Sequence, residues 1–164
     1  MKTLFCIGFS VIYVVGRGQD RAMEAREVLQ AKSTMHQECD AGDVRFRLCG
    51  LYIEEGWLWL VLRATNRSAI DFKPAAMHCT IRDKHSVRRR ALQELRLYPV
   101  YSDPPVVLRS GTSSWICYAV EPRVPRKHQE LVLTWGDRNG DRRLEMHVSG
   151  RAVLHARPLS LHDD

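Results

Sequence analysis

Apolar and polar side chains alternate with a period of two over most of the chain after residue 43. Val44, Phe46 and Leu48 alternate with arginines, and after Gly50 the apolar positions shift by one residue to give Leu51 and Ile53. Strict alternation is typical of strands with one buried face, so these residues predict a strand. A one-residue shift at a glycine predicts a β-bulge at that point.

Turn signals divide this part of the chain into about eight short strands. Residues 57–64 are a continuous apolar run between turn residues, which predicts a central strand. The Asn139-Gly140 pair is a strong hairpin signal, and Pro99 marks the end or the edge of a strand. The further expected strands are residues 76–83, 88–101, 113–120, 131–135, 143–148 and 152–156. Many short strands at regular spacing predict an all-β fold, an immunoglobulin-like or related β-sandwich, with an open barrel as the alternative.

The first 18 residues have the pattern of an export signal. Lys2 precedes an apolar segment at residues 4–15, and Gly16 and Gly18 place small residues before a cleavage site at Gln19. The apolar segment is short for a standard membrane-spanning helix. A buried first strand and an uncleaved anchor are the alternatives.

Helix-forming residues follow the expected signal. Residues 20–37 carry a sparse apolar stripe of Met23, Val28 and Met35, which predicts a short N-terminal surface helix or tether. Residues 39–43 contain helix and strand breakers and are expected to be a loop. The expected organisation is a signal peptide at 1–18, a helical tether and loop at 19–43, and a β-sandwich domain at 44–160.

The charge balance is basic, with 25 Lys and Arg residues against 19 Asp and Glu residues and a net charge of +6. A basic balance favours acidic partners, although the two signs are interspersed, as on an ordinary solvated surface. The densest run predicts a basic ridge of Lys84, Arg88, Arg89, Arg90 and Arg96. Such a ridge could bind phosphate, or it could protect a solvated strand edge from aggregation.

Patterns of catalytic or metal-binding residues are missing from the sequence, so we expect a protein that is not an enzyme, with no catalytic residue, cofactor or metal. HExxH, a nucleophile elbow and a glycine-rich phosphate loop are all absent. His78 and Cys79 are adjacent, so on a strand they face opposite sides and cannot share a metal. Asp137, Asn139 and Asp141 resemble part of a calcium loop, but the glycine position favours a simple hairpin turn.

The cysteines and tryptophans are expected to be mainly structural. Four cysteines follow the expected signal: Cys39, Cys49, Cys79 and Cys117. Export would expose them to an oxidising compartment, but three pairings are possible and the sequence leaves the disulfide state open. Cys79 shares its alternation with Met77 and Ile81, which predicts a buried thiol, while Cys39 and Cys49 are close enough in sequence for a local bridge.

The tryptophans lie within expected strands: Trp57, Trp59, Trp115 and Trp135. This placement favours core packing over base stacking.

Several segments together resemble one known family. They are residues 51–68 (LYIEEGWLWLVLRATNRS), 81–84 (IRDK), 88–101 (RRRALQELRLYPVY), 139–144 (NGDRRL) and 152–159 (AVLHARPL). Their order and spacing resemble the C-terminal part of the TraN proteins of Bacteroidetes conjugative transposons. The resemblance covers about residues 40–160, and members of that family usually carry a further domain before this one.

The resemblance implies a structural part of a conjugation machine. A TraN-like protein would sit in the periplasm, associated with the outer membrane, and would contact other subunits of an apparatus similar to type IV secretion. Partner identity, stoichiometry and oligomeric state are left open. The alternatives are a stand-alone exported β-sandwich that binds a glycan or lipid, and an accessory protein that binds single-stranded DNA through the basic ridge.

Overall fold

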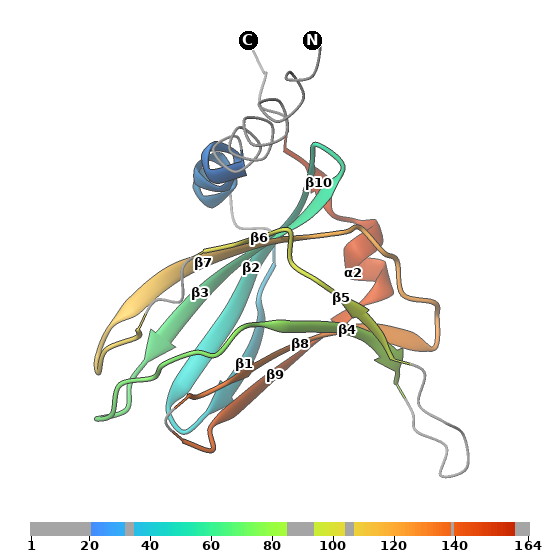
Figure 1. Ribbon diagram of the computed structural model, residues 1–164. Coiled ribbons are helices and arrows are strands. Elements are labelled where there is room, and N and C mark those ends of the chain that lie inside the picture. Colours follow the sequence, from blue (N-terminus) through green and yellow to red (C-terminus); the bar gives the residue numbers. More distant parts are fainter. Residues whose placement is uncertain (1–20, 32–34, 85–93, 104–106, 139, 160–164) are drawn as a thin grey trace, which may run out of the picture.

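The computed structural model describes residues 21–31, 35–84, 94–103, 107–138 and 140–159, and two β-sheets packed face to face dominate it (Figure 1). The larger sheet has the order β1-β2-β3-β7-β6, formed by Gln37–Ala41, Val44–Glu54, Trp57–Asn66, Ser113–Val120 and Tyr101–Ser102. A short strand, β10 (Arg157–Pro158), pairs in parallel with β2. The smaller sheet has the order β5-β4-β8-β9, formed by Leu95–Leu97, His78–Asp83, Gln129–Gly136 and Arg143–Ser149. The β-sandwich predicted from the alternation is confirmed.

The main core lies between the two sheets. Phe46 of β2 meets Trp135 of β8 with ring centroids 4.8 Å apart, and Phe72 packs edge-on against the same phenylalanine. The alternate residues of β9 point into this core, as expected from their period. Cys79 also faces the core together with Met77 and Ile81, which confirms the predicted buried thiol.

Two tight hairpins and a bulge shape β2. The loops Gly42-Asp43 and Glu55-Gly56 each have two residues with positive φ, as type I′ turns require. The pairing of β2 with β3 shifts between Leu48 and Gly50, which confirms the predicted bulge. A Cβ at Gly50 would lie only 2.4 Å from the Tyr52 ring, so this position needs glycine.

The N-terminal helix covers part of the outer face of the larger sheet (Figure 1). Residues 21–30 are helical, and Ala25 and Val28 pack into a second apolar cluster built around Trp59. The Arg21 guanidinium donates to the Val100 carbonyl oxygen at 3.1 Å, which fastens the helix further. A short N-terminal helix is thus confirmed, but Met23 is exposed, so its predicted place in the apolar stripe was wrong.

Three local predictions were wrong. Gln37–Ala41 form strand β1 where a loop was expected, because the Gly42-Asp43 turn closes a hairpin instead of breaking the chain. The expected strand at 88–101 is divided in its described part, since β5 and β6 belong to different sheets and are separated around Pro99. The segment expected as a last strand is helix α2, Gly150–Leu154, where the Ser149 hydroxyl oxygen accepts a hydrogen bond from the Ala152 amide at 3.2 Å. This side-chain cap starts a helical turn and stops strand β9.

The four described cysteines are not in disulfides. The proposed local bridge is wrong in this structure because Cys39 packs against the main core whereas Cys49 lies in the cluster on the opposite face of the sheet. Cys49 and Cys117 share that cluster, but β3 separates their strands. Two strand spacings amount to about 9–10 Å, which exceeds the reach of a disulfide.

The expected signal peptide at 1–18 lies outside the described residues. Among the helices that the structure describes, none has the length and apolar character needed to cross a membrane.

Candidate interaction surfaces

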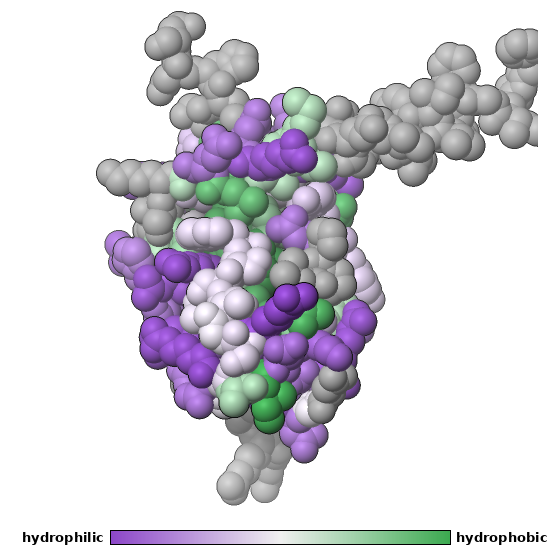
Figure 2. Space-filling view, turned by 90° about the vertical axis from the view of Figure 1, so that its left-hand side faces the viewer, coloured by the Kyte–Doolittle hydropathy of each residue, from purple (hydrophilic) through white to green (hydrophobic). Residues whose placement is uncertain are grey.

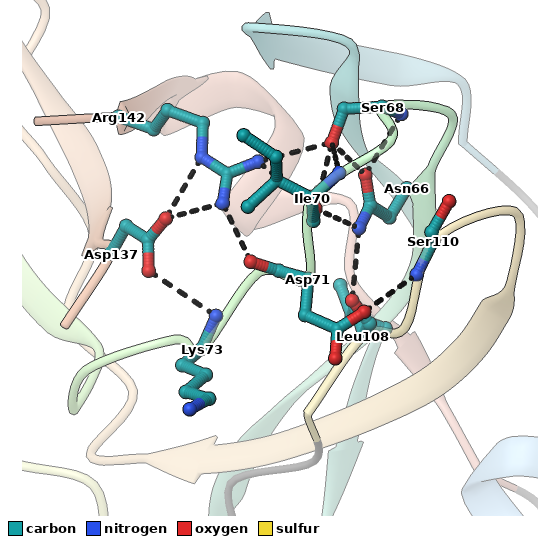
Figure 3. A network of polar contacts seen from close by, with 9 residues as sticks. All are labelled: Asn66, Ser68, Ile70, Asp71, Lys73, Leu108, Ser110, Asp137 and Arg142. Atoms are coloured by element: carbon teal, nitrogen blue, oxygen red, sulfur yellow. Dashed lines mark hydrogen bonds and ion pairs between the residues drawn. The ribbon is translucent and has the colours of Figure 1, made fainter. Parts of the chain in front are cut away.

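One end of the sandwich is held by a polar network centred on Arg142 (Figure 3). The guanidinium donates to the Asp137 carboxylate at 2.8 Å through Nε, to the Asp71 carbonyl at 2.8 Å and to the Ser68 hydroxyl at 3.1 Å. The Asp137 side chain is only 1% exposed, and its other oxygen accepts from the Lys73 amide at 3.3 Å. We call this set, with Asn66, the Arg142 network.

Asn66 anchors the other side of the Arg142 network. This fully buried side chain donates to the carbonyl oxygens of Ile70 and Leu108, both at 2.9 Å, and accepts from the amide and the hydroxyl of Ser68. Its amide hydrogens and its oxygen are therefore all paired, as a buried amide requires. The network ties the loop after β3 to the loops before β7 and before β9.

The Arg142 network joins two of the segments singled out in the sequence, residues 51–68 and 139–144. Asn66 and Ser68 end the first segment, and Arg142 lies in the NGDRRL segment. These residues act as turn and packing positions, since each contact holds a loop in place. Figure 2 shows this end of the molecule, where strongly hydrophilic residues are separated by paler and apolar areas.

A shallow groove lies beside the network on the outer face of the smaller sheet. Its volume is about 430 Å³, and the residues that line it include Arg82, Arg96, Arg143, Glu94 and Asp141. Arg82 of β4 forms an ion pair with Glu145 of β9, across the intervening strand β8. Charges of both signs thus border the groove, which suits a polar protein partner better than a simple anion.

The predicted basic ridge is only partly described. Arg96 on β5 lines the groove, and Lys84 directly follows β4 with its backbone amide bonded to the His128 carbonyl oxygen. Arg88, Arg89 and Arg90 lie outside the described residues, so the ridge as a whole stays a prediction. The structure instead brings Arg96 together with Arg82, Arg142 and Arg143.

The sequence alone did not predict this second group of arginines, because their proximity depends on the order of the strands in the sheet. The alternation of β4 and β9 places Arg82 and Arg143 on polar faces. Only the pairing of both strands with β8 puts them on one surface with Arg96.

The described histidines and cysteines are not arranged for metal chemistry. Within residues 21–159, outside the gaps in the description, no cluster of three His, Cys, Asp or Glu side chains could hold a metal ion. His78 is exposed whereas Cys79 is buried, which confirms that the two face opposite sides. Burial raises the pKa of the Cys39 and Cys79 thiols to about 12, so both are protonated and weakly nucleophilic at neutral pH.

The tryptophans differ in their surroundings. Trp59 and Trp135 are fully buried, which confirms their predicted core positions, and Trp57 is partly buried. Trp115 is 47% exposed on the outer face of the larger sheet, so its core assignment was wrong. It lies under the Arg63 guanidinium, 5.9 Å from the ring centroid.

Comparison with known proteins assigns the family. The family model of a domain of unknown function (DUF4138) matches residues 19–158, which include both sheets and the N-terminal helix. Comparison with curated proteins finds no match. Because the family model covers most of the sequence, the chain belongs to the DUF4138 family.

Proposed function

We propose that the protein is a structural, non-enzymatic subunit of a conjugative transfer apparatus resembling type IV secretion. It is exported to the periplasm, associates with the outer membrane and works through contacts with other subunits. The observation that carries the proposal is the meeting of two TraN-like segments in the Arg142 network. Segments that specify one shared turn arrangement support a common domain architecture, and with it a common role.

The surface of the smaller sheet supports a role in binding protein partners. Strand β5 has only three residues and pairs, within the described part of the chain, with β4 alone. Two exposed apolar side chains, Leu95 and Tyr98, lie in and next to it. An open strand edge with apolar side chains suits β-augmentation by an extended partner segment, with the adjacent charged groove selecting its polar residues.

Recovery of partners from donor cells tests the proposal. A tagged chain, cross-linked in donor cells during mating, should co-purify with other conjugation subunits. Deletion of its gene should lower transfer frequency, and expression of the intact chain should restore it. Failure of the intact chain to recover any conjugation subunit would contradict the proposed function.

A double variant locates the docking edge. Leu95→Asp with Tyr98→Asp puts charge at the exposed apolar positions of β5 and should weaken recovery by about tenfold or more. Val124→Asp makes the same kind of change at another exposed apolar position and should leave recovery unchanged. Equal recovery by both variants would place the contact elsewhere on the molecule.

A further inference from the structure

A second cleft lies on the outer face of the larger sheet. Its volume is about 220 Å³. It is lined by Arg45, Arg47, Arg63, Thr65, Arg67 and Ser113. We call it the arginine cleft. It shares no lining residue with the groove on the smaller sheet.

Strand register gathers these arginines. Arg47 of β2 lies directly opposite Arg63 of β3, and Arg45 lies opposite Thr65. Opposed residues of antiparallel strands have Cβ atoms only about 5 Å apart, and like charges in such pairs are destabilising. Opposed arginines with this energetic cost are expected where their positive charge serves a function.

The positive charge of the arginine cleft is only partly balanced from within. Glu38 of the edge strand β1 forms ion pairs with Arg47 and, at 3.4 Å, with Arg45. Arg63 stacks over Trp115, and across the described ranges of the chain no carboxylate pairs with Arg63 or Arg67. Among the described residues, Glu38 is therefore the carboxylate that pairs with the cleft, and it contacts two of its four guanidinium groups.

The hydroxyl groups add neutral donors on the same surface. Thr65 Oγ1 and Ser113 Oγ are 2.9 Å apart and share one hydrogen bond. Because that bond uses one hydroxyl hydrogen of the pair, the other is free to donate. Donors therefore come from three adjacent strands, β2, β3 and β7.

We propose that the arginine cleft binds a phosphate group. Guanidinium forks match phosphate oxygens in pairs, and a tetrahedral group accepts hydrogen bonds from several directions, as donors on three strands require. A planar carboxylate presents only two oxygens, and Glu38 already supplies one carboxylate to the cleft. Exposed Trp115 offers an apolar surface beside the cleft for the group that carries the phosphate. The phosphate can belong to a small soluble molecule or to a lipid headgroup.

Titration with inorganic pyrophosphate at constant ionic strength tests the proposal. The intact protein should bind it saturably, as followed by calorimetry and by the emission of Trp115. Arg63→Gln and Arg67→Gln should each weaken binding by about tenfold, because each removes one charged fork. Arg123→Gln removes the same charge from an exposed arginine outside the cleft and should change the affinity less than about twofold. Because Arg63 and Arg67 are exposed, their substitution should leave the fold intact. Equal midpoints of thermal unfolding for all variants would show this.

Each remaining result has a defined meaning. Absence of saturation, or equal weakening by Arg123→Gln, overturns the proposal because the effect would then be general charge. Citrate binding as tightly as pyrophosphate also overturns it and favours an acidic protein segment as the partner. Vesicles containing phosphatidic acid that sediment the intact protein but not Arg63→Gln would assign the phosphate to a lipid. Saturable pyrophosphate binding without vesicle binding would assign it to a soluble ligand.

Discussion

At the scale of single residues, the most informative positions are polar side chains that the fold encloses. Asn66 is fully buried and Asp137 is nearly so, yet both are paired. Asn66 bonds to the loops after β3 and before β7, and Asp137 bonds to the loops after β3 and before β9. Buried polar groups are costly unless they are paired, so a substitution at one member affects the others. This dependence explains why residues without reactive chemistry can mark a family.

Replacement of Arg142 is the sharpest test of this view. Arg142→Ala removes the guanidinium from a carboxylate that is 1% exposed and should lower the free energy of unfolding by about 3–5 kcal/mol. Arg142→Lys keeps the charge but loses the fork, so its loss should be intermediate. Urea denaturation measures the free energy of unfolding of both variants.

Arg143→Ala is the matched control. Its side chain is 68% exposed and its ion pair with Glu145 spans 3.5 Å, so the loss should stay below about 1 kcal/mol. If Arg142→Ala were no more destabilising than this neighbour, the network would not hold the loops.

At the scale of elements, strands with clear alternation were predictable and segments without it were not. Ser113–Val120 and Arg143–Ser149 form strands where alternation and turn signals coincide. Residues 152–156 carry apolar positions that fit a strand or one helical turn equally well, so the Ser149 cap decided the outcome. Pro99 was expected to end a strand, but only the sheet pairing shows that the chain changes layers there.

Helix α2 can start where it does because Gly150 leaves room for a neighbouring loop. A Cβ at this position would lie 2.5 Å from the Pro125 carbonyl oxygen, which is backbone and cannot rotate away. Alanine would gain about 1 kcal/mol of helix propensity over glycine, but the clash should outweigh it. Gly150→Ala should therefore lower the free energy of unfolding by about 1–3 kcal/mol, measured by thermal denaturation.

The control for this substitution is Gly136, at the end of strand β8. A Cβ at Gly136 meets no atom within 4 Å, so Gly136→Ala should change the stability by less than about 1 kcal/mol. A Gly150→Ala variant as stable as the natural chain would mean that the loop at Pro125 moves freely.

At the scale of the whole molecule, the two-layer architecture was readable from the sequence, whereas its surfaces were not. Alternation along β2, β4 and β9 predicted which of their residues face the core, whereas Trp115 of β7 was misplaced. It did not predict that Arg47 lies beside Arg63, because strand order and register place residues distant in sequence next to each other. The arginine cleft and the groove are both properties of sheet pairing.

Burial of cysteine thiols in the core makes the stability of the fold depend on pH. Burial raises the pKa of the Cys79 thiol from 9.0 to about 12. The folded state therefore holds this proton more tightly than the unfolded state does. Its contribution to stability is present below pH 9 and is lost progressively as the pH rises from 9 towards 12.

Comparison of slopes tests this linkage. For each such thiol, the free energy of unfolding should fall by about 1.4 kcal/mol per pH unit above pH 9. Cys79→Ala should lower stability at pH 8 because it empties a core position, but its decline between pH 9 and 10.5 should be shallower by about that amount. Urea denaturation under reducing conditions gives both slopes. Cys117 and Tyr118 also have a raised pKa through burial, so some decline should remain in the variant. Parallel slopes for the two proteins would show that the Cys79 thiol ionises as readily in the core as in the unfolded chain.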